Sequence, residues 1–117
     1  MKGQPLAKRF GFAADGLLLA WRREVSLRQQ VVAAFAVLAA LLLARPAALW
    51  WAVAALAVGL VWVAELFNTA VEQLCDHLHP EVHPQIRAVK DVAAGAVLVA
   101  SATALLVSLA FLIDRLL

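Results

Sequence analysis

Three long uncharged stretches divide this chain of 117 residues. They cover residues 31–44, 47–64 and 92–113, which are 14, 18 and 22 residues long. A helix needs about 20 residues to cross the hydrocarbon of a bilayer. The polar residues Gln29 and Gln30 can extend the short first stretch into the membrane interface. The pattern therefore predicts three transmembrane helices.

The segments between these stretches predict how the helices are connected. Arg45-Pro46 alone separates the first two, and a proline ends one helix and can open the next, so they form an antiparallel hairpin. Residues 76–91 contain two prolines and all three histidines, and predict the one sizeable polar loop. In Leu6–Arg23, apolar and charged residues mix, which predicts an amphipathic helix lying in the interface. We expect one domain, residues 1–117, with a surface part at 1–28 and the spans at 29–113.

The composition excludes a soluble domain of this size. Hydrophobic residues make up 65% and charged residues 15% of the chain, and the mean hydropathy is +0.88. So small a soluble protein could not hide that much apolar surface. The net charge of +2 comes without a basic cluster interleaved with aromatic residues, so we expect no nucleic acid partner. Cys75 is the single cysteine, which excludes an internal disulfide.

The basic residues predict the orientation of the chain in the membrane. If the amino terminus is cytoplasmic, eight of the ten cations lie inside and only Arg45 and Arg115 lie outside. Trp21 is then suited to anchor the inner interface, and Trp50 with Trp51 the outer one. We therefore expect residues 76–91 to face the cytoplasm.

Glu65 follows the second uncharged stretch directly, and an unpaired carboxylate against lipid is costly. On a helix, Glu65, Asn68, Glu72 and Asp76 would form one stripe about 80° wide. Glu65 and Glu72 would be about 10 Å apart along the axis. The deeper carboxylate is suited to take a proton from an alcohol, and the shallower ones to hold magnesium with a nucleotide. A solvated helix end is the structural alternative, and for Asp76 it is equally good.

Other charged residues suggest how this site could be completed. Lys90-Asp91 stands immediately before the third span, where the lysine is either a simple interfacial anchor or a ligand for phosphate. Glu24 could pair with Arg28 one turn on, or complete a metal site with Glu72. No cysteine pair or HExxH motif supports a zinc site, so the histidines are ordinary loop residues, with one of them, His83, a candidate nucleotide contact.

The run Glu65-Leu66-Phe67-Asn68-Thr69-Ala70-Val71-Glu72 resembles the prokaryotic diacylglycerol kinase family, which also includes undecaprenol kinases. The resemblance continues through nearly the whole chain, in Gly16-Leu17, Ala20-Trp21, Glu24, Arg28-Gln29, Asp76, Glu81, His83 and Lys90-Asp91-Val92-Ala93-Ala94-Gly95-Ala96-Val97. It implies an all-α membrane protein with an amino-terminal amphipathic surface helix and three transmembrane helices, assembled as a homotrimeric bundle with shared active sites. It also implies the bacterial cytoplasmic (inner) membrane, with the active site facing the cytoplasm among membrane lipids.

The same resemblance implies an enzyme that transfers the γ-phosphate of ATP, with Mg²⁺, to a lipid hydroxyl. Glu65 matches the general base, and Asn68 stands beside it. Glu24 and Glu72 match the metal-binding carboxylates. The implied nucleotide contacts are Glu24, Glu72, Asp76, Glu81, His83, Lys90, Asp91 and Lys8. The implied lipid contacts are Trp21, Arg28, Gln29 and Glu65.

The lipid acceptor is less sharply indicated. The run 92–97 is more like the undecaprenol branch, whereas Arg28-Gln29 favours the diacylglycerol branch. The chain departs from the enterobacterial pattern at Pro5, Phe12 and Val82, and Gln30 replaces an acidic residue. We expect conversion of diacylglycerol to phosphatidic acid, with undecaprenol as the alternative acceptor. A non-enzymatic membrane packing protein or an ion conduit could use a carboxylate such as Glu65, but neither requires the charged residues around it.

Overall fold

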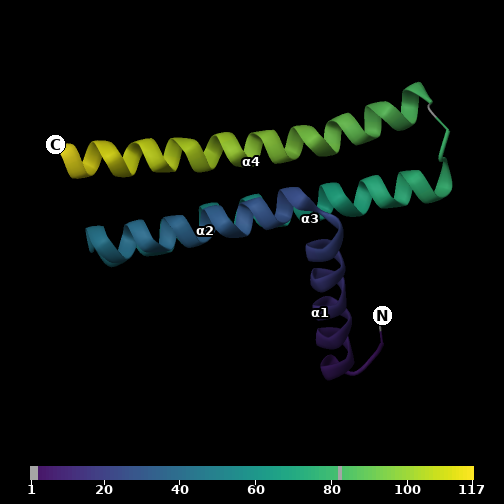
Figure 1. Ribbon diagram of the computed structural model, residues 1–117, viewed down its shortest axis with the longest axis horizontal. Coiled ribbons are helices and arrows are strands. Elements are labelled where there is room, and N and C mark those ends of the chain that lie inside the picture. The colour runs from purple at the N-terminus through teal and green to yellow at the C-terminus, as the bar shows by residue number, and fades with distance from the viewer. Residues whose placement is uncertain (1–2, 82) are drawn as a thin grey trace.

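The computed structural model describes residues 3–81 and 83–117, so position 82, where the sequence departs from the enterobacterial pattern, lies outside the described residues. Four helices follow one another: α1 (Leu6–Arg23), α2 (Val25–Ala44), α3 (Ala48–Leu78) and α4 (Pro84–Leu116) (Figure 1). The helices α2, α3 and α4 are long and apolar enough to cross a membrane. The predicted all-helical class and the three predicted spans are confirmed.

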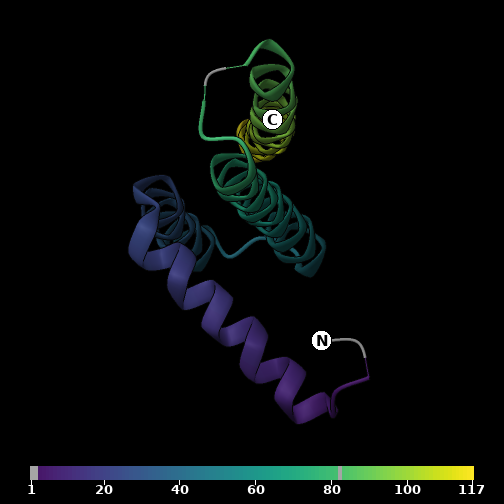
Figure 2. The same cartoon turned by 90° about the vertical axis from the view of Figure 1, so that its right-hand side faces the viewer.

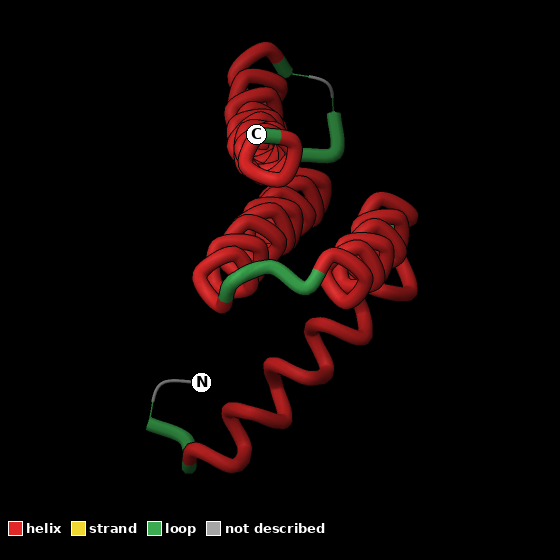
Figure 3. Tube along the Cα trace, turned by 90° about the vertical axis from the view of Figure 1, so that its left-hand side faces the viewer, coloured by secondary structure: helices red, strands yellow, loops and turns green. Residues whose placement is uncertain are grey.

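Glu24 forms the corner between α1 and α2. Its backbone is extended (φ −111°, ψ 110°), and its N–H donates to the carbonyl oxygen of Ala20 at 2.8 Å, which closes the last turn of α1. The chain then starts α2 at Val25, six residues before the uncharged stretch, so Gln30 is already on the second turn of a helix. Figures 2 and 3 show α1 as a separate arm that leaves the other three helices.

A tight turn at Arg45-Pro46 joins α2 to α3. Arg45 has a left-handed backbone (φ 50°), and its N–H donates to the carbonyl oxygen of Leu41 at 2.9 Å. Such a residue closes a helix, and the proline after it prevents continuation. The guanidinium of Arg115 also donates to the carbonyl oxygen of Ala44 at 2.7 Å, where a cation suits the negative end of a helix. The predicted antiparallel hairpin is confirmed (Figure 3).

The expectation of a long polar loop at residues 76–91 is wrong. Helix α3 continues through Asp76 to Leu78, and α4 begins at Pro84. Proline at the first helical position has a preset backbone angle, and His83 caps the helix because its Nδ1 accepts from the N–H of Gln85 at 3.1 Å. The segment is polar because both helices are longer than the membrane is thick: 31 and 33 residues correspond to roughly 47 and 50 Å, against about 30 Å of hydrocarbon.

The most extensive helix contact is between α3 and α4, which lie side by side (Figures 1 and 2). Few side chains are buried, and most of these are small, such as Ala57 and Ala100, which let helix backbones approach closely. At the far end, Trp50 packs edge to face on Phe111 with ring centroids 5.2 Å apart, and its indole donates to Asp114 at 3.0 Å. Helices α3 and α4 form a second hairpin, which these contacts hold together at the end away from its loop. The loop end of this α3–α4 hairpin holds the polar residues.

Candidate active site at the polar end of the α3–α4 hairpin

Glu65 lies on α3 just beyond the uncharged stretch, and only 6% of its surface is exposed. Its Oε2 accepts a hydrogen bond from Nε2 of Gln30 on α2, at 3.4 Å. One turn further on, Thr69 is buried as well. Glu24 and Glu72 are near enough to act electrostatically on the Glu65 carboxylate. The structure therefore presents a solvent-shielded carboxylate that is held by a neutral donor.

The predicted stripe is a continuous face of α3, because residues 65–76 belong to one unbroken helix. Asn68 is half-buried, and its Oδ1 is buried without a hydrogen-bond partner among the described residues. Further along, Glu72 is half-buried and Asp76 is exposed. Solvent access thus increases from Glu65 towards the end of the helix, so one face of α3 connects the membrane boundary with water.

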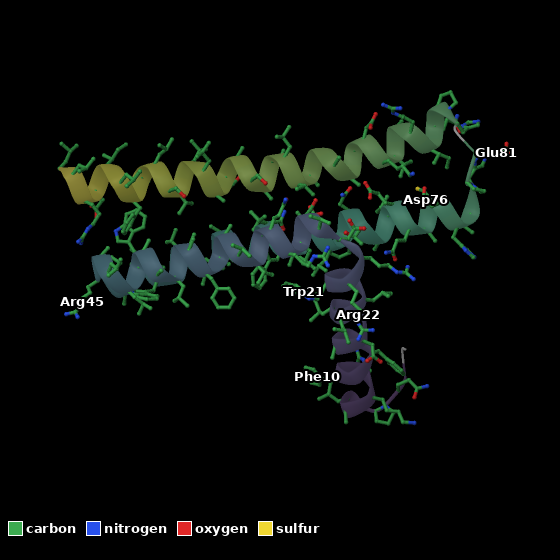
Figure 4. All side chains as sticks on the ribbon, in the orientation of Figure 1. Phe10, Trp21, Arg22, Arg45, Asp76 and Glu81 are labelled. Atoms are coloured by element: carbon green, nitrogen blue, oxygen red, sulfur yellow. The ribbon has the colours of Figure 1, made fainter. Side chains whose placement is uncertain are left out.

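A cleft of about 360 Å³ opens where α3, the loop and α4 meet. Its charged and imidazole side chains come from both helices and the loop: Glu72, Asp76, His79, Glu81, His83, Arg87, Lys90 and Asp91. Figure 4 shows Asp76 and Glu81 at this end and Arg45 at the opposite end. A cleft with both signs of charge can bind phosphate through its cations and a hard metal ion through its carboxylates.

The cations of the cleft are paired with its carboxylates. Nζ of Lys90 donates to Oδ1 of Asp76 at 2.5 Å, joining α4 to α3. Nε of Arg87 lies 3.9 Å from Oδ2 of Asp91, one helical turn away. Arg87 and Asp91 are largely open to water and Lys90 is partly exposed, so an incoming anion can compete for the cations. The rings of His79 and His83 pack edge to face, with their centroids 5.3 Å apart, and form the loop side of the cleft.

The structure brings most, but not all, of the predicted nucleotide contacts together. Six of them line the cleft: Glu72, Asp76, Glu81, His83, Lys90 and Asp91. Glu24 lies instead at the corner between α1 and α2, and Lys8 is exposed on α1. Within residues 3–81 and 83–117, no group of three His, Cys, Asp or Glu side chains is arranged to hold a metal ion. The metal set of Glu24 and Glu72 therefore stays a prediction.

The predicted lipid contacts lie near the same corner. Trp21 is 41% exposed on the last turn of α1 (Figure 4), Arg28 is half-buried and Gln29 is exposed. Three residues of the site, Gln30, His79 and Arg87, were not among the predicted contacts. Gln30 is the hydrogen-bond partner of Glu65, although the sequence marked it only as an extension of the first span and as a departure from the family pattern. His79 and Arg87 line the cleft, although His79 counted only as a loop residue and Arg87 only among the cytoplasmic cations.

Fold and site together define an integral membrane protein with a charged cleft of about 360 Å³ at one end of its helices. The family model described as Prokaryotic diacylglycerol kinase matches residues 11–112, and the chain belongs to this family. It is 32% identical to an undecaprenol kinase of Bacillus subtilis (strain 168), over 93% of this chain and 89% of that one. It is 36% identical to a diacylglycerol kinase of Helicobacter pylori (strain ATCC 700392 / 26695), over 80% and 73% of the two chains.

A diacylglycerol kinase of Escherichia coli (strain K12) is 33% identical, over 81% of this chain and 78% of that one. The family predicted from the Glu65–Glu72 run is confirmed. The predicted enzyme class, a kinase, is confirmed with it.

Proposed function

We propose that this protein phosphorylates the hydroxyl group of a membrane lipid, with ATP as the phosphate donor and Mg²⁺ as the cofactor. The observation that carries the proposal is the shielded Glu65 carboxylate at the apolar boundary, on the same face of α3 as the charged cleft. A lipid hydroxyl approaches from the membrane and a nucleotide from water. Helix α3 is the element that reaches both.

Glu65 acts as the general base in this proposal. One of its oxygens accepts from Gln30, and the other is left for the hydroxyl proton of the lipid. Asn68, one turn along, has a buried amide oxygen free to accept a further hydrogen bond. A phosphoryl transfer needs mainly alignment of the reacting groups and neutralisation of charge. A fixed base at the membrane boundary supplies the first of these.

The cleft supplies the charge neutralisation. Lys90 exchanges Asp76 for the phosphates of the nucleotide, and Arg87 adds a second cation on α4. Glu72 and Glu24 have the carboxylate oxygens that Mg²⁺ prefers, and both are near enough to Glu65 to act on its charge. Bound Mg²⁺ would neutralise the phosphate oxygens as the bond to the leaving nucleotide breaks.

The arrangement in the membrane and the assembly belong to the same proposal. Helix α1 lies on the membrane surface, and the cleft faces the cytoplasm, in agreement with eight of ten cations on that side. The lipid enters near Trp21, Arg28 and Gln29, beside the corner between α1 and α2. The family resemblance implies a homotrimer, in which a neighbouring copy can close the cleft that α3 and α4 of one copy leave open to water.

Diacylglycerol is the main candidate acceptor and undecaprenol the alternative. Arg28-Gln29 lies at the corner where the lipid enters and favours diacylglycerol. The run 92–97 on α4 is more like the undecaprenol branch. The relatives divide in the same way, since those of H. pylori and E. coli are named for diacylglycerol and that of B. subtilis for undecaprenol.

The test is a phosphorylation assay with purified protein in mixed micelles, labelled ATP and Mg²⁺, run side by side with dioleoylglycerol and with undecaprenol. Label in phosphatidic acid, at a higher rate than in undecaprenyl phosphate, supports the main proposal. The reverse preference supports the alternative acceptor. A micelle without acceptor measures hydrolysis of ATP by water. If neither lipid is labelled above that control, the kinase proposal fails and a packing protein or ion conduit becomes the better account.

A further inference from the structure

Gln30 is the residue that holds the carboxylate of Glu65. It lies on the second turn of α2, half-buried, 35 positions before its partner in the sequence. Its Nε2 donates to Oε2 of Glu65 at 3.4 Å. This contact crosses from α2 to α3 at the membrane boundary, where a carboxylate has little water to satisfy it.

The surroundings of Gln30 determine which end of its amide faces Glu65. Gln30 forms part of the wall of a groove of about 230 Å³ between α2, α3 and α4, and the other wall residues are apolar or small, among them Ala33, Trp62 and Ser101. The Oε1 atom of Gln30 is buried without a partner among the described residues. An amide oxygen turned towards a carboxylate would be repelled, whereas the amide nitrogen can only donate. The Glu65 charge therefore orients the NH₂ group towards itself.

We propose that Gln30 is a positioning residue of the reaction: it fixes the Glu65 carboxylate through one oxygen and leaves the other oxygen free for the lipid hydroxyl. This inference rests on the proposed function. Hydrogen bonds to ionised carboxylates are stronger than neutral ones, and bonds that are long in a free enzyme shorten when substrate binds. Because an amide neither gives up nor takes a proton, it holds the base in its ionised form.

An acidic side chain at position 30, as in the enterobacterial branch, would place a second carboxylate against Glu65. Two carboxylates at hydrogen-bond distance cannot both be ionised easily, so the pair shares a proton. Negative charge already comes from Glu24 at the corner between α1 and α2 and from Glu72 on α3. The charged side chains of α4 at this end, Arg87, Lys90 and Asp91, line the cleft. In this chain the neutral amide adds no further negative charge beside Glu65.

The experiment compares kcat and KM of full-length wild-type protein, Gln30→Met and Gln30→Glu in the mixed-micelle assay. Methionine has a similar length but no donor, so kcat should fall about 10- to 100-fold, as expected for loss of a hydrogen bond to a charged group. The KM for MgATP should change less than about twofold, because the cleft is untouched. Gln73→Met is the matched control: it makes the same exchange on α3 at a half-buried glutamine with no role in the site.

The pH dependence separates positioning from packing. For Gln30→Glu, the acidic limb of the kcat profile should move to higher pH by about one unit or more, because one proton is shared by two carboxyl groups. An unchanged kcat in Gln30→Met, an equal loss in Gln73→Met, or a Gln30→Glu profile that superimposes on the wild type would overturn the inference. In each of these cases the wild type is active, so the proposed function stands. A wild type that labels neither lipid overturns both.

Discussion

Replacing Glu65 by glutamine removes one charge and keeps the shape of the side chain. Because only 6% of Glu65 is exposed and its partner is the neutral amide of Gln30, a second amide can occupy the same space. The helix α3 should therefore keep its packing. The reaction loses its base, and general-base catalysis contributes about 10²- to 10⁴-fold. Each tenfold loss of rate corresponds to about 1.36 kcal/mol, so the activation free energy of the transfer rises by about 2.7 to 5.4 kcal/mol.

Initial rates in mixed micelles at saturating MgATP and lipid give kcat directly. The KM for MgATP should stay near the wild-type value, since the cleft lies further along α3. Asp114→Asn, which removes a carboxylate at the opposite end of the hairpin, is the matched control and should retain wild-type kcat. A Glu65→Gln variant that keeps more than about a tenth of wild-type kcat would refute the role of Glu65 as base.

Three further predictions address the cleft and the far end. Glu72→Gln should raise the Mg²⁺ concentration needed for half-maximal rate as well as lower kcat; an unchanged magnesium titration contradicts its role as a metal ligand. Lys90→Met should raise the KM for MgATP about tenfold or more, through loss of a charge-assisted contact to phosphate; an unchanged KM places the phosphates elsewhere. Trp50→Phe keeps the ring contact with Phe111 but loses the bond to Asp114, so unfolding in detergent should cost about 0.6 kcal/mol less, with kcat unchanged; unchanged stability contradicts a structural role for that bond.

The apolar pattern predicted the helices well because a backbone in lipid must form its hydrogen bonds within the protein, as a helix does. The bounds of Leu6–Arg23 and the turn at Arg45-Pro46 follow from local sequence, where proline and charged residues interrupt the apolar ones. Residues 76–91 were misjudged because polar composition resembles a loop, whereas two long helices can leave the membrane together and continue in water. Composition alone does not distinguish these cases.

The stripe on α3 was predictable because helical spacing places its members on one face. The contacts between helices were not. Gln30 and Glu65 are 35 positions apart, and Asp76 and Lys90 are 14 apart across a chain reversal. Both pairs depend on how α2, α3 and α4 are rotated and shifted against one another. Side-chain periodicity within a single helix does not contain that information.

Direct transfer of the γ-phosphate from ATP to the lipid hydroxyl is tested by the configuration at phosphorus. With ATP made chiral at its γ-phosphate by oxygen isotopes, the phospholipid product should show inversion, because a hydroxyl deprotonated by Glu65 attacks in line with the leaving nucleotide. Retention of configuration would mean two displacements through a phosphorylated side chain, and would contradict the role of Glu65 as the base in a single step.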